Sequence, residues 1–522
     1  MRRRFLSYVL AAWLVLPAIA ARGRNIEQWG VFELTLQGPS QGNPFVDCEL
    51  WARFTQAETS IEVRGFYDGQ GMYRVRFMPP RQGQWTYRTR SNRAELSGKS
   101  GQFTCVAAGA GNHGPVRVRN THHFAYADGT AYKPVGTTAY GWVHQPDELQ
   151  EQTLATLKAS GFNKIRMCVL PTRYGDERDR PRRFPFLQRD GGGFDVERFD
   201  VEFFANLERR IGQLRDLGIE ADLILFHPYD EGQMGFDRMP AEADDRYLRY
   251  VVARLGACRN VWWSLANEFD LMTEKTDADF DRFFQILQAE DPYAHLRSIH
   301  FSQRMYDPCK PWVTHLSVQN GLAVSDFGRA VLYRQVCAKP IVYDEVRYEG
   351  NIERRWGQLS GQEMLLRMWM GTIAGTYVGH GECLREGDKP VWLSKGGVLR
   401  GSSAARIRFL RQVLDDAPEE GIEPIDQFYE TRMGGKAGEY YLIYFGRETP
   451  QQWLFELPKD GLADGMRFRV EVLDTWEMTV RPVDGTFVIR RHSPYAFRAE
   501  KDAEIPLPGK PYQAIRIRRV PE

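Results

Sequence analysis

Apolar and polar residues alternate along the first hundred positions with the period of two that half-buried β-strands show. Residues 29–36 and 73–77 follow this pattern, and turn signals such as Gly38-Pro39 separate such runs. Short strands at this spacing predict an immunoglobulin-like β-sandwich over residues 25–108. A Gly/Ala-rich linker then leads into the next part of the chain.

From residue 133 the pattern changes to strand, loop and helix, repeated. The strand candidates are short apolar runs at 134–140, 164–170, 220–226, 261–265, 296–301, 313–318, 341–343 and 376–379. Helical periodicity is present at 148–160, 201–217, 244–255, 277–288, 327–336 and 362–373. Eight strands that alternate with helices over about 250 residues indicate a (β/α)8 barrel, which we place at residues 114–418. The connection after the fifth strand is short and contains two prolines, so we expect a loop there.

After Gly421 the helical period disappears. Residues 466–472 alternate strictly, whereas 440–445 and 487–489 are short continuous apolar runs, typical of strands covered on both faces. This region, 421–522, is predicted to be a second β-sandwich packed on the barrel. The predicted fold class is therefore multidomain α/β and all-β, with a central (β/α)8 TIM barrel flanked by two β-sandwich domains.

Residues 1–21 follow the pattern of a secretory signal peptide. Three arginines at 2–4 precede an apolar segment at 5–19, and residues 18–20 form a small-x-small cleavage motif. The apolar segment is too short to span a bilayer comfortably, and an uncleaved anchor is the alternative. We expect a secreted or periplasmic protein with no membrane attachment in its mature form.

The composition narrows the function classes. Lys and Arg number 69 against 68 Asp and Glu, so the net charge of +1 provides no field to attract a nucleic acid. Aromatic residues make up 13% of the chain, which fits stacking on sugar faces as well as a large core. The seven cysteines are few for an exported chain, and Cys48 and Cys105 either pair across the first sandwich or remain free thiols. Cys/His clusters with zinc spacing are missing, so we predict no metal and no cofactor.

Two predicted barrel strands are followed at once by a glutamate. The run 261–266 leads into an Asn-Glu pair that ends at Glu268, and the run 341–343 leads into an Asp-Glu pair that ends at Glu345. The carboxyl ends of the strands form the active face of a parallel barrel. Glycosidic hydrolysis needs two carboxyl groups there, about 5–5.5 Å apart in retaining enzymes. The two glutamates are therefore the candidate catalytic pair, with an ordinary ion pair as the alternative for either residue alone.

These motifs carry a family resemblance. Asn267-Glu268 resembles the acid/base motif of clan A glycoside hydrolases, and Asp344-Glu345 resembles their nucleophile strand. The whole chain is similar to a narrower group of secreted, family 5-like glycosidases. That group joins an N-terminal immunoglobulin-like domain to an apiosidase-like barrel and a C-terminal β-domain. The segments that carry this second resemblance are 66–69, 76–79, 128–129, 135–140 and 380–382.

The resemblance implies that Glu268 is the acid/base and Glu345 the nucleophile of a double displacement. It also implies that Asn267 binds the 2-hydroxyl of the sugar. Arg166, on the second strand, matches the basic residue that keeps the nucleophile ionised, with a buried ion-pair partner as the alternative.

Tryptophans are expected near two parts of the predicted site, the acid/base and the subsite that holds the sugar. Apolar neighbours such as Trp262 or Trp263 would favour the protonated form of the acid. Clan A barrels often place a tryptophan directly on the eighth strand, but residues 380–382 read His-Gly-Glu here, and Trp392 comes later. This departure leaves the shape of the sugar subsite open.

Further side chains at the strand ends are candidate substrate contacts. They are Tyr140, Trp142 and His144 after the first strand, His227 after the third, His300 after the fifth, Gln319 after the sixth, and His380 and Glu382 after the eighth. The aromatic rings among them can form a sugar platform, whereas a hydrogen-bonding spacer is the alternative for each histidine. Glu382 is the rival carboxylate, and together with the three later histidines it defines a weaker metal-site alternative.

The sequence thus predicts a retaining glycoside hydrolase that acts on a poly- or oligosaccharide. A catalytically inert carbohydrate-binding or scaffold protein is the alternative, and a metal-dependent hydrolase is a third. The predicted partner is a carbohydrate, and the sequence leaves the oligomeric state open. We expect the β-domains to brace the barrel.

Overall fold

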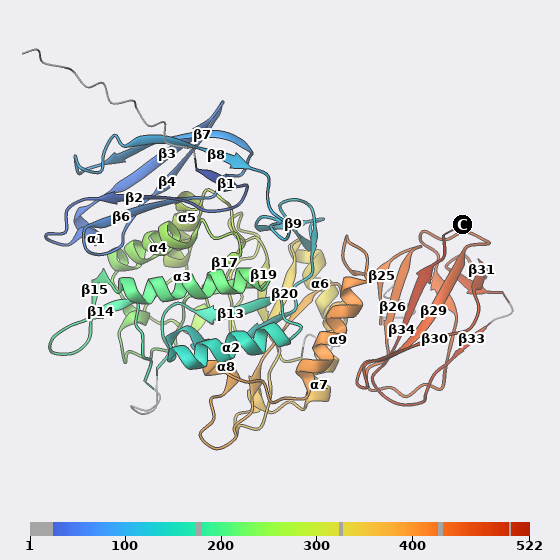
Figure 1. Ribbon diagram of the computed structural model, residues 1–522. Helices are drawn as coiled ribbons and strands as arrows, with labels where there is room; N and C mark the ends of the chain where they lie inside the picture. Colours follow the sequence, from blue (N-terminus) through green and yellow to red (C-terminus); the bar gives the residue numbers. More distant parts are fainter. Residues whose placement is uncertain (1–23, 174–179, 323–326, 426–431, 501–502, 522) are drawn as a thin grey trace, which may run out of the picture.

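The computed structural model describes residues 24–173, 180–322, 327–425, 432–500 and 503–521. Figure 1 shows a barrel with one β-domain above the helices α4 and α5 and another beside α7 and α9. The predicted signal peptide, 1–21, lies outside the described residues. Within the described parts of the chain, no helix is long and apolar enough to cross a membrane.

The central domain is a ring of eight parallel strands. In chain order they are β12 (Gly136–Thr138), β13 (Lys164–Cys168), β16 (Glu220–Phe226), β17 (Val261–Ala266), β18 (Arg297–Ser298), β19 (Leu316–Gln319), β20 (Ile341–Glu345) and β22 (Tyr377–His380). A parallel bridge between His300 and Ser317 joins the fifth strand to the sixth and closes the ring. The predicted barrel is confirmed, and strands such as β13, β16 and β17 are buried along their whole length because both faces are covered.

Helices follow most of these strands. They are α2 (Asp147–Ala159), α3 (Val201–Asp216), α4 (Ala241–Leu255), α5 (Asp277–Glu290), α6 (Phe327–Cys337), α7 (Gly361–Ile373), the short α8 (Trp392–Lys395) and α9 (Ser403–Asp415). The residues between β18 and β19 form no helix, as predicted. The hairpin of β14 (Phe186–Gln188) and β15 (Phe194–Phe199), inserted before α3, was not predicted.

The N-terminal domain is a sandwich of two sheets, as predicted. One sheet contains β1 (Asn25–Glu27), β8 (Ser100–Val106), β7 (Gly83–Ser91), β3 (Leu50–Gln56) and β4 (Thr59–Arg64), and the other contains β2 (Phe32–Gln37), β6 (Met72–Phe77) and β5 (Phe66–Tyr67). The short helix α1 (Pro44–Asp47) lies between β2 and β3. Aromatic rings from both sheets fill the core, where Phe54 stacks on Phe77 with ring centroids 4.1 Å apart. Cys48 and Cys105 are free thiols.

Charged side chains join this sandwich to the barrel. Arg254 of α4 is buried, and its guanidinium lies 2.5 Å from Glu208 and 2.8 Å from Asp68. The same guanidinium lies over the ring of Phe66, 4.7 Å from its centroid. Arg76 of β6 also binds Glu208, at 2.7 Å. The segments 66–69 and 76–79, part of the family resemblance, therefore hold the two domains together.

We expect Arg254→Ala to lower the free energy of unfolding by about 3 kcal/mol, because it removes the buried guanidinium that Glu208 and Asp68 share and leaves each carboxylate with one cation fewer. Urea unfolding followed by tryptophan fluorescence measures the change. The matched control is Arg53→Ala, because Arg53 faces Glu62 across an exposed pair at 3.8 Å and should cost less than about 1 kcal/mol. Equal stability of the two variants would contradict the bracing role of the interface.

The C-terminal domain is a large antiparallel sheet with a smaller one against it. The large sheet contains β24 (Glu423–Pro424), β25 (Met433–Lys436), β26 (Tyr440–Tyr444), β34 (Gln513–Arg519), β29 (Arg467–Asp474), β31 (Phe487–Arg491), β32 (Ala496–Ala499), β28 (Glu456–Pro458) and β30 (Thr479–Pro482), and the small one contains β27 (Gln452–Leu454) and β33 (Glu504–Pro506). This confirms the predicted second β-domain. It packs on the barrel through α7, where the rings of Trp369 and Tyr444 stack with centroids 5.2 Å apart.

A three-stranded sheet covers the N-terminal end of the barrel. It contains β9 (Val116–Arg119), β10 (His123–Tyr126) and β11 (Ala131–Tyr132). Phe124 packs on Trp262 and on Tyr377, with ring centroids 5.2 and 5.4 Å apart. Trp262 therefore belongs to the end of the barrel opposite to Glu268.

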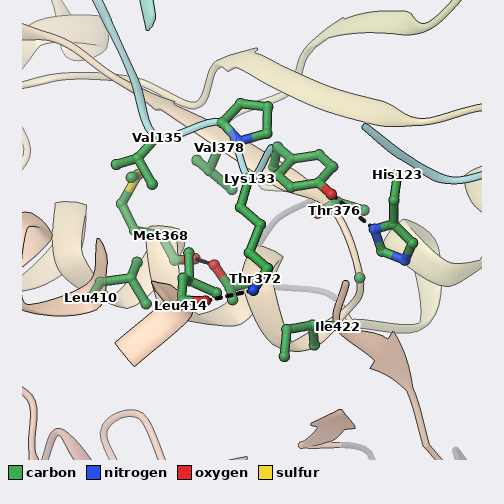
Figure 2. Close-up of a pocket in the computed structure, with 13 residues that line it drawn as sticks. His123, Lys133, Val135, Met368, Thr372, Thr376, Val378, Leu410, Leu414 and Ile422 are labelled. Carbon is green, nitrogen blue, oxygen red and sulfur yellow. Dashed lines mark hydrogen bonds between the residues drawn. The ribbon is translucent and has the colours of Figure 1, made fainter. Parts of the chain in front are cut away.

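A cavity of about 20 Å³ lies at the same end, beside the starts of β12 and β22. Figure 2 shows the side chains that line it. Val135 and Tyr377 line it together with apolar side chains of α7 and α9. Lys133 donates to the carbonyl oxygens of Leu414 (2.7 Å) and Ala417 (2.8 Å). A space of this size holds about one water molecule, and the N-terminal face of such barrels serves stability. The cavity is therefore no substrate site.

Candidate active site

Glu268 and Glu345 both lie at the carboxyl end of the barrel strands. Glu345 is the last residue of β20 and is buried, whereas Glu268 follows β17 closely and is half-buried. Glu268 has φ 43° and ψ 50°, in the left-handed region, and it begins the 3-10 helix η4 (Phe269–Leu271). A non-glycine residue costs about 1–3 kcal/mol in this region, and such strain is typical of functional sites.

Tyr229 and Asn267 connect the two carboxylates. The Tyr229 hydroxyl donates to Glu268 Oε2 at 2.9 Å and accepts from Asn267 Nδ2. The same Nδ2 lies 3.3 Å from Glu345 Oε1. Each of these three contacts is 3.3 Å or shorter, so the two carboxylates lie within about 10 Å of each other. This upper limit includes the carboxyl separations of both retaining and inverting glycosidases.

Glu345 Oε1 lies near a tyrosine hydroxyl, a guanidinium and an imidazole. Tyr140 donates its hydroxyl hydrogen to Glu345 Oε1. Arg166 Nη1 and His300 Nε2 each lie 3.6 Å from the same oxygen. Burial and then the charge of Glu345 raise the pKa of Tyr140 well above its ordinary value, so the phenol keeps its hydrogen. Tyr140 thus presents a hydrogen-bond donor, and Arg166 a cation, to the predicted nucleophile.

A layer of buried charges lies beneath Glu345 inside the barrel. Lys164 Nζ donates to Asp222 at 2.5 Å and to Asp344 at 2.9 Å. Burial alone raises the pKa of Asp344, but Lys164 and Arg166 together lower it well below its ordinary value. Arg166 also donates to Asn267 Oδ1, which turns Nδ2 of that amide toward the two glutamates. Lys164 and Asp222 were not predicted, although a charged residue inside an apolar strand is a signal for such a site.

Glu268 is bound on its other side by a chain of polar side chains. Gln319 Nε2 lies 2.9 Å from Glu268 Oε1, and Gln319 Oε1 lies 2.9 Å from His300 Nε2. His300 Nδ1 in turn lies 2.9 Å from Ser317 Oγ, which donates to Asp344 at 2.5 Å. Burial and then Arg166 lower the pKa of His300 to about 3, so this imidazole is neutral at ordinary pH.

The structure brings seven of the predicted site residues into this cluster. They are Glu268, Glu345, Asn267, Arg166, Tyr140, His300 and Gln319. His227 lies behind the cluster, with Nε2 2.9 Å from the Leu170 carbonyl and its ring stacked on Tyr229, centroids 5.2 Å apart. His227 thus positions Tyr229, a cluster residue that was not among the predicted contacts.

Trp142 and His144, predicted as substrate contacts, lie in the core instead. The chain turns into the 3-10 helix η1 (Trp142–His144) directly after the first strand, and this turn directs both side chains inward. The Trp142 indole is fully buried and donates to Met167 Sδ at 2.9 Å. His144 is buried between the carbonyls of Arg183 (2.9 Å) and Cys168 (3.2 Å).

His380 and Glu382, also predicted as substrate contacts, belong to a separate group with Glu349. Their donor atoms lie within 4.8 Å of one another, a geometry open to a metal among the described residues. However, the four carboxylate oxygens already accept main-chain N–H groups of residues 400–403, at 2.7–3.0 Å. The two glutamates, on the paired strands β21 (Glu349–Gly350) and β23 (Glu382–Cys383), anchor the turn that begins α9.

The tryptophans expected near the acid also lie elsewhere. The Trp262 indole donates to Glu220 at 3.1 Å, and the Trp263 indole donates to Asp291 at 3.0 Å. Trp392 is fully buried and donates to Thr137 at 2.9 Å. The hydrogen-bond partners of Glu268 are instead Tyr229 and Gln319.

Three family models match successive parts of the chain. Residues 25–92 match a domain of unknown function (DUF5060), residues 118–392 match an apiosidase-like catalytic domain, and residues 429–518 match a second domain of unknown function (DUF5605). These matches follow the order of the sandwich, the barrel and the C-terminal β-domain.

Solved structures also resemble the chain. A crystal structure of a candidate glycoside hydrolase from Bacteroides vulgatus ATCC 8482 is 41% identical, has a TM-score of 0.90, and covers 95% of this chain and 100% of its own. A glycoside hydrolase family 5 structure from the same organism is 14% identical, with a TM-score of 0.57 over 78% of this chain and 93% of its own, and therefore shows the fold alone. Among curated proteins, none matches the chain significantly.

Proposed function

This chain belongs to the family of apiosidase-like catalytic domains, and from that premise we propose that it is a retaining glycoside hydrolase acting on a poly- or oligosaccharide. The contact chain from Glu268 through Tyr229 and Asn267 to Glu345 carries the proposal. It joins one buried carboxylate beside the Arg166 guanidinium to one half-buried carboxyl, the combination that a nucleophile and an acid/base require.

In the first step, Glu345 attacks the anomeric carbon of the bound sugar. Arg166 and Tyr140 favour the ionised form of this carboxylate until the bond forms. Glu268 gives its proton to the glycosidic oxygen as the bond between that oxygen and the anomeric carbon breaks. The products are the free leaving-group alcohol and a glycosyl ester on Glu345.

In the second step, the Glu268 carboxylate takes a proton from water, whose oxygen attacks the anomeric carbon from the side that the leaving group vacated. The ester bond breaks, and Glu345 leaves as a carboxylate. Two inversions give net retention of the anomeric configuration. Asn267, oriented by Arg166, is proposed to donate to the 2-hydroxyl in both steps.

The anomeric configuration of the first-formed product tests this mechanism. A panel of aryl glycosides and of plant and bacterial polysaccharides identifies a substrate, and proton NMR of the early reaction then reads the configuration. We expect retention. An inverted product would show that the enzyme uses a single displacement and not a double displacement. Binding of an oligosaccharide without any hydrolysis would favour an inert carbohydrate-binding protein.

A further inference from the structure

A buried arginine of α7 joins two of the loops at the mouth of the barrel. Arg367 is 3% exposed, and one nitrogen of its guanidinium, Nη1, donates to the main-chain carbonyl oxygens of Gly321 and Val346. The second of these bonds is 2.9 Å long. We propose that Arg367 is a positioning residue for Glu345, the proposed nucleophile. The inference rests on the proposed function, and it concerns a residue that acts on Glu345 through the main chain.

The two carbonyl groups belong to the loops that follow β19 and β20. Val346 comes directly after Glu345, the last residue of β20. Gly321 lies two positions after Gln319, the last residue of β19. The two loops also bind each other, because the Asn320 N–H donates to the Glu345 carbonyl oxygen at 3.1 Å. Since Nη1 has two hydrogens, one for each carbonyl, it fixes the spacing of the loops where the proposed nucleophile ends its strand.

The chain turns sharply after Glu345 and needs such a hold. Arg347 has φ 73°, in the left-handed region, where a residue other than glycine costs about 1–3 kcal/mol. Such a conformation persists only where the surrounding structure enforces it. The Arg347 side chain donates to the Arg355 carbonyl oxygen, from Nε at 3.0 Å and from Nη2 at 2.6 Å. These bonds hold the turn itself, whereas Arg367 holds the residue before it, next to Glu345.

The Arg367 guanidinium is fixed on its other side by an acid that also binds the C-terminal domain. Glu363, one turn earlier in α7, accepts with Oε1 from Arg367 Nε at 3.2 Å, and Nη2 lies 3.1 Å from the same oxygen. The other oxygen of Glu363 accepts from Arg447, which follows β26. Arg367 thus connects the loop after Glu345 to α7 and, through Glu363, to the C-terminal β-domain.

Arg367→Met tests the positioning role, because methionine keeps an unbranched apolar side chain and removes both donations to the loops. We expect kcat, measured with a dinitrophenyl glycoside that the wild type hydrolyses, to fall about tenfold, while KM changes less than about threefold. The reason is that Glu345 keeps its chemistry and loses only its exact place. Arg367→Lys supplies one donor nitrogen on a shorter side chain and should restore part of the rate.

Arg334→Met is the matched control. Arg334 of α6 is also 3% exposed, and it donates to the Gly375 carbonyl oxygen and to Glu423. Gly375 comes just before β22, so this arginine has the same kinds of partner at the end of the barrel opposite to Glu345. The control should lower the thermal unfolding midpoint by a similar amount and leave kcat within about twofold of the wild type. An equal loss of kcat in the control would show that the loss reflects general destabilisation.

A nucleophile from solution separates positioning of Glu345 from a general disturbance of the site. Glu345→Gly leaves a space from which azide can attack the anomeric carbon as dinitrophenolate departs, which gives a glycosyl azide of inverted configuration. Arg367→Met should change the rate of this azide reaction less than about twofold, because no carboxylate remains to be positioned. A tenfold loss in this background as well would overturn the inference.

Amide hydrogen exchange without substrate keeps the inference testable apart from the proposed function. Mass spectrometry of the peptide that contains Asn320 should show at least about fivefold faster exchange in Arg367→Met than in the wild type, and no change in Arg334→Met. Unchanged exchange in Arg367→Met would overturn the inference even if the enzyme is active. Faster exchange in a protein that hydrolyses no glycoside would support the hold on the loops and contradict the proposed function. If the methionine variant does not fold, Arg367→Lys should give a smaller increase in the same direction.

Discussion

Replacing Glu345 by glutamine should remove nearly all turnover while the fold stays intact. The amide has almost the size of the carboxylate and keeps its place beside Tyr140 and Asn267, but it cannot form the glycosyl ester. We expect kcat to fall by about 10,000-fold or more for activated and natural glycosides alike. The loss should not depend on the leaving group, because no substrate property replaces a missing nucleophile.

The measurements are initial rates and the thermal unfolding midpoint of the same preparation. Glu382→Gln is the matched control, because the structure assigns that rival carboxylate to the turn before α9. The control should lower the unfolding midpoint and leave the activity of the folded enzyme within a few-fold of the wild type. If Glu345→Gln kept more than a few per cent of the wild-type rate, another group would be the nucleophile.

Replacing Glu268 by alanine should produce a loss that depends on the leaving group. Glycosides with poor leaving groups should lose about 1,000-fold in kcat/KM, since they need the proton. Dinitrophenolate departs without protonation, so the first step with dinitrophenyl glycosides should proceed almost normally. The glycosyl ester should then accumulate. Azide should then restore turnover, because it attacks the ester without needing a base.

The product identifies the mechanism in this second experiment. Azide enters from the face opposite to Glu345, so the glycosyl azide should have the anomeric configuration of the substrate. Glu231→Ala is the control, because Glu231 lies beyond the third strand as an exposed ion-pair partner of Arg173 at 2.8 Å. It should show neither a leaving-group dependence nor an azide effect. An azide product of inverted configuration would exclude Glu345 as the covalent nucleophile.

Much of the architecture was predictable because the signals are local. Most of the eight barrel strands lie in short, largely apolar runs that end where polar residues begin, and the half-buried strands of the two β-domains alternate with a period of two. The fifth connection lacks a helix because its short, proline-containing stretch cannot form one. The hairpin of β14 and β15 was not predicted, because its strands are short and only partly buried.

The site was predictable only as far as the strand ends. A residue at the end of a strand or within two positions of it, such as Gln319 or Glu268, has its position set by that strand. Trp142 and His144 come only a few residues later, yet the chain has by then turned into η1 and points them into the core. Tyr229 reaches the cluster because the ring of His227 stacks against it, a contact that no periodicity reveals.

The sequence by itself determined the order of the strands, their places to within a few residues, and which acids stand near their carboxyl ends, because these depend on short-range patterns. The tertiary structure alone decided which polar groups meet: Lys164 binds Asp344 across 180 positions of the chain, and Gln319 reaches Glu268 across 51. Such pairs form because ring closure brings the second, fourth, sixth and seventh strands around one barrel interior.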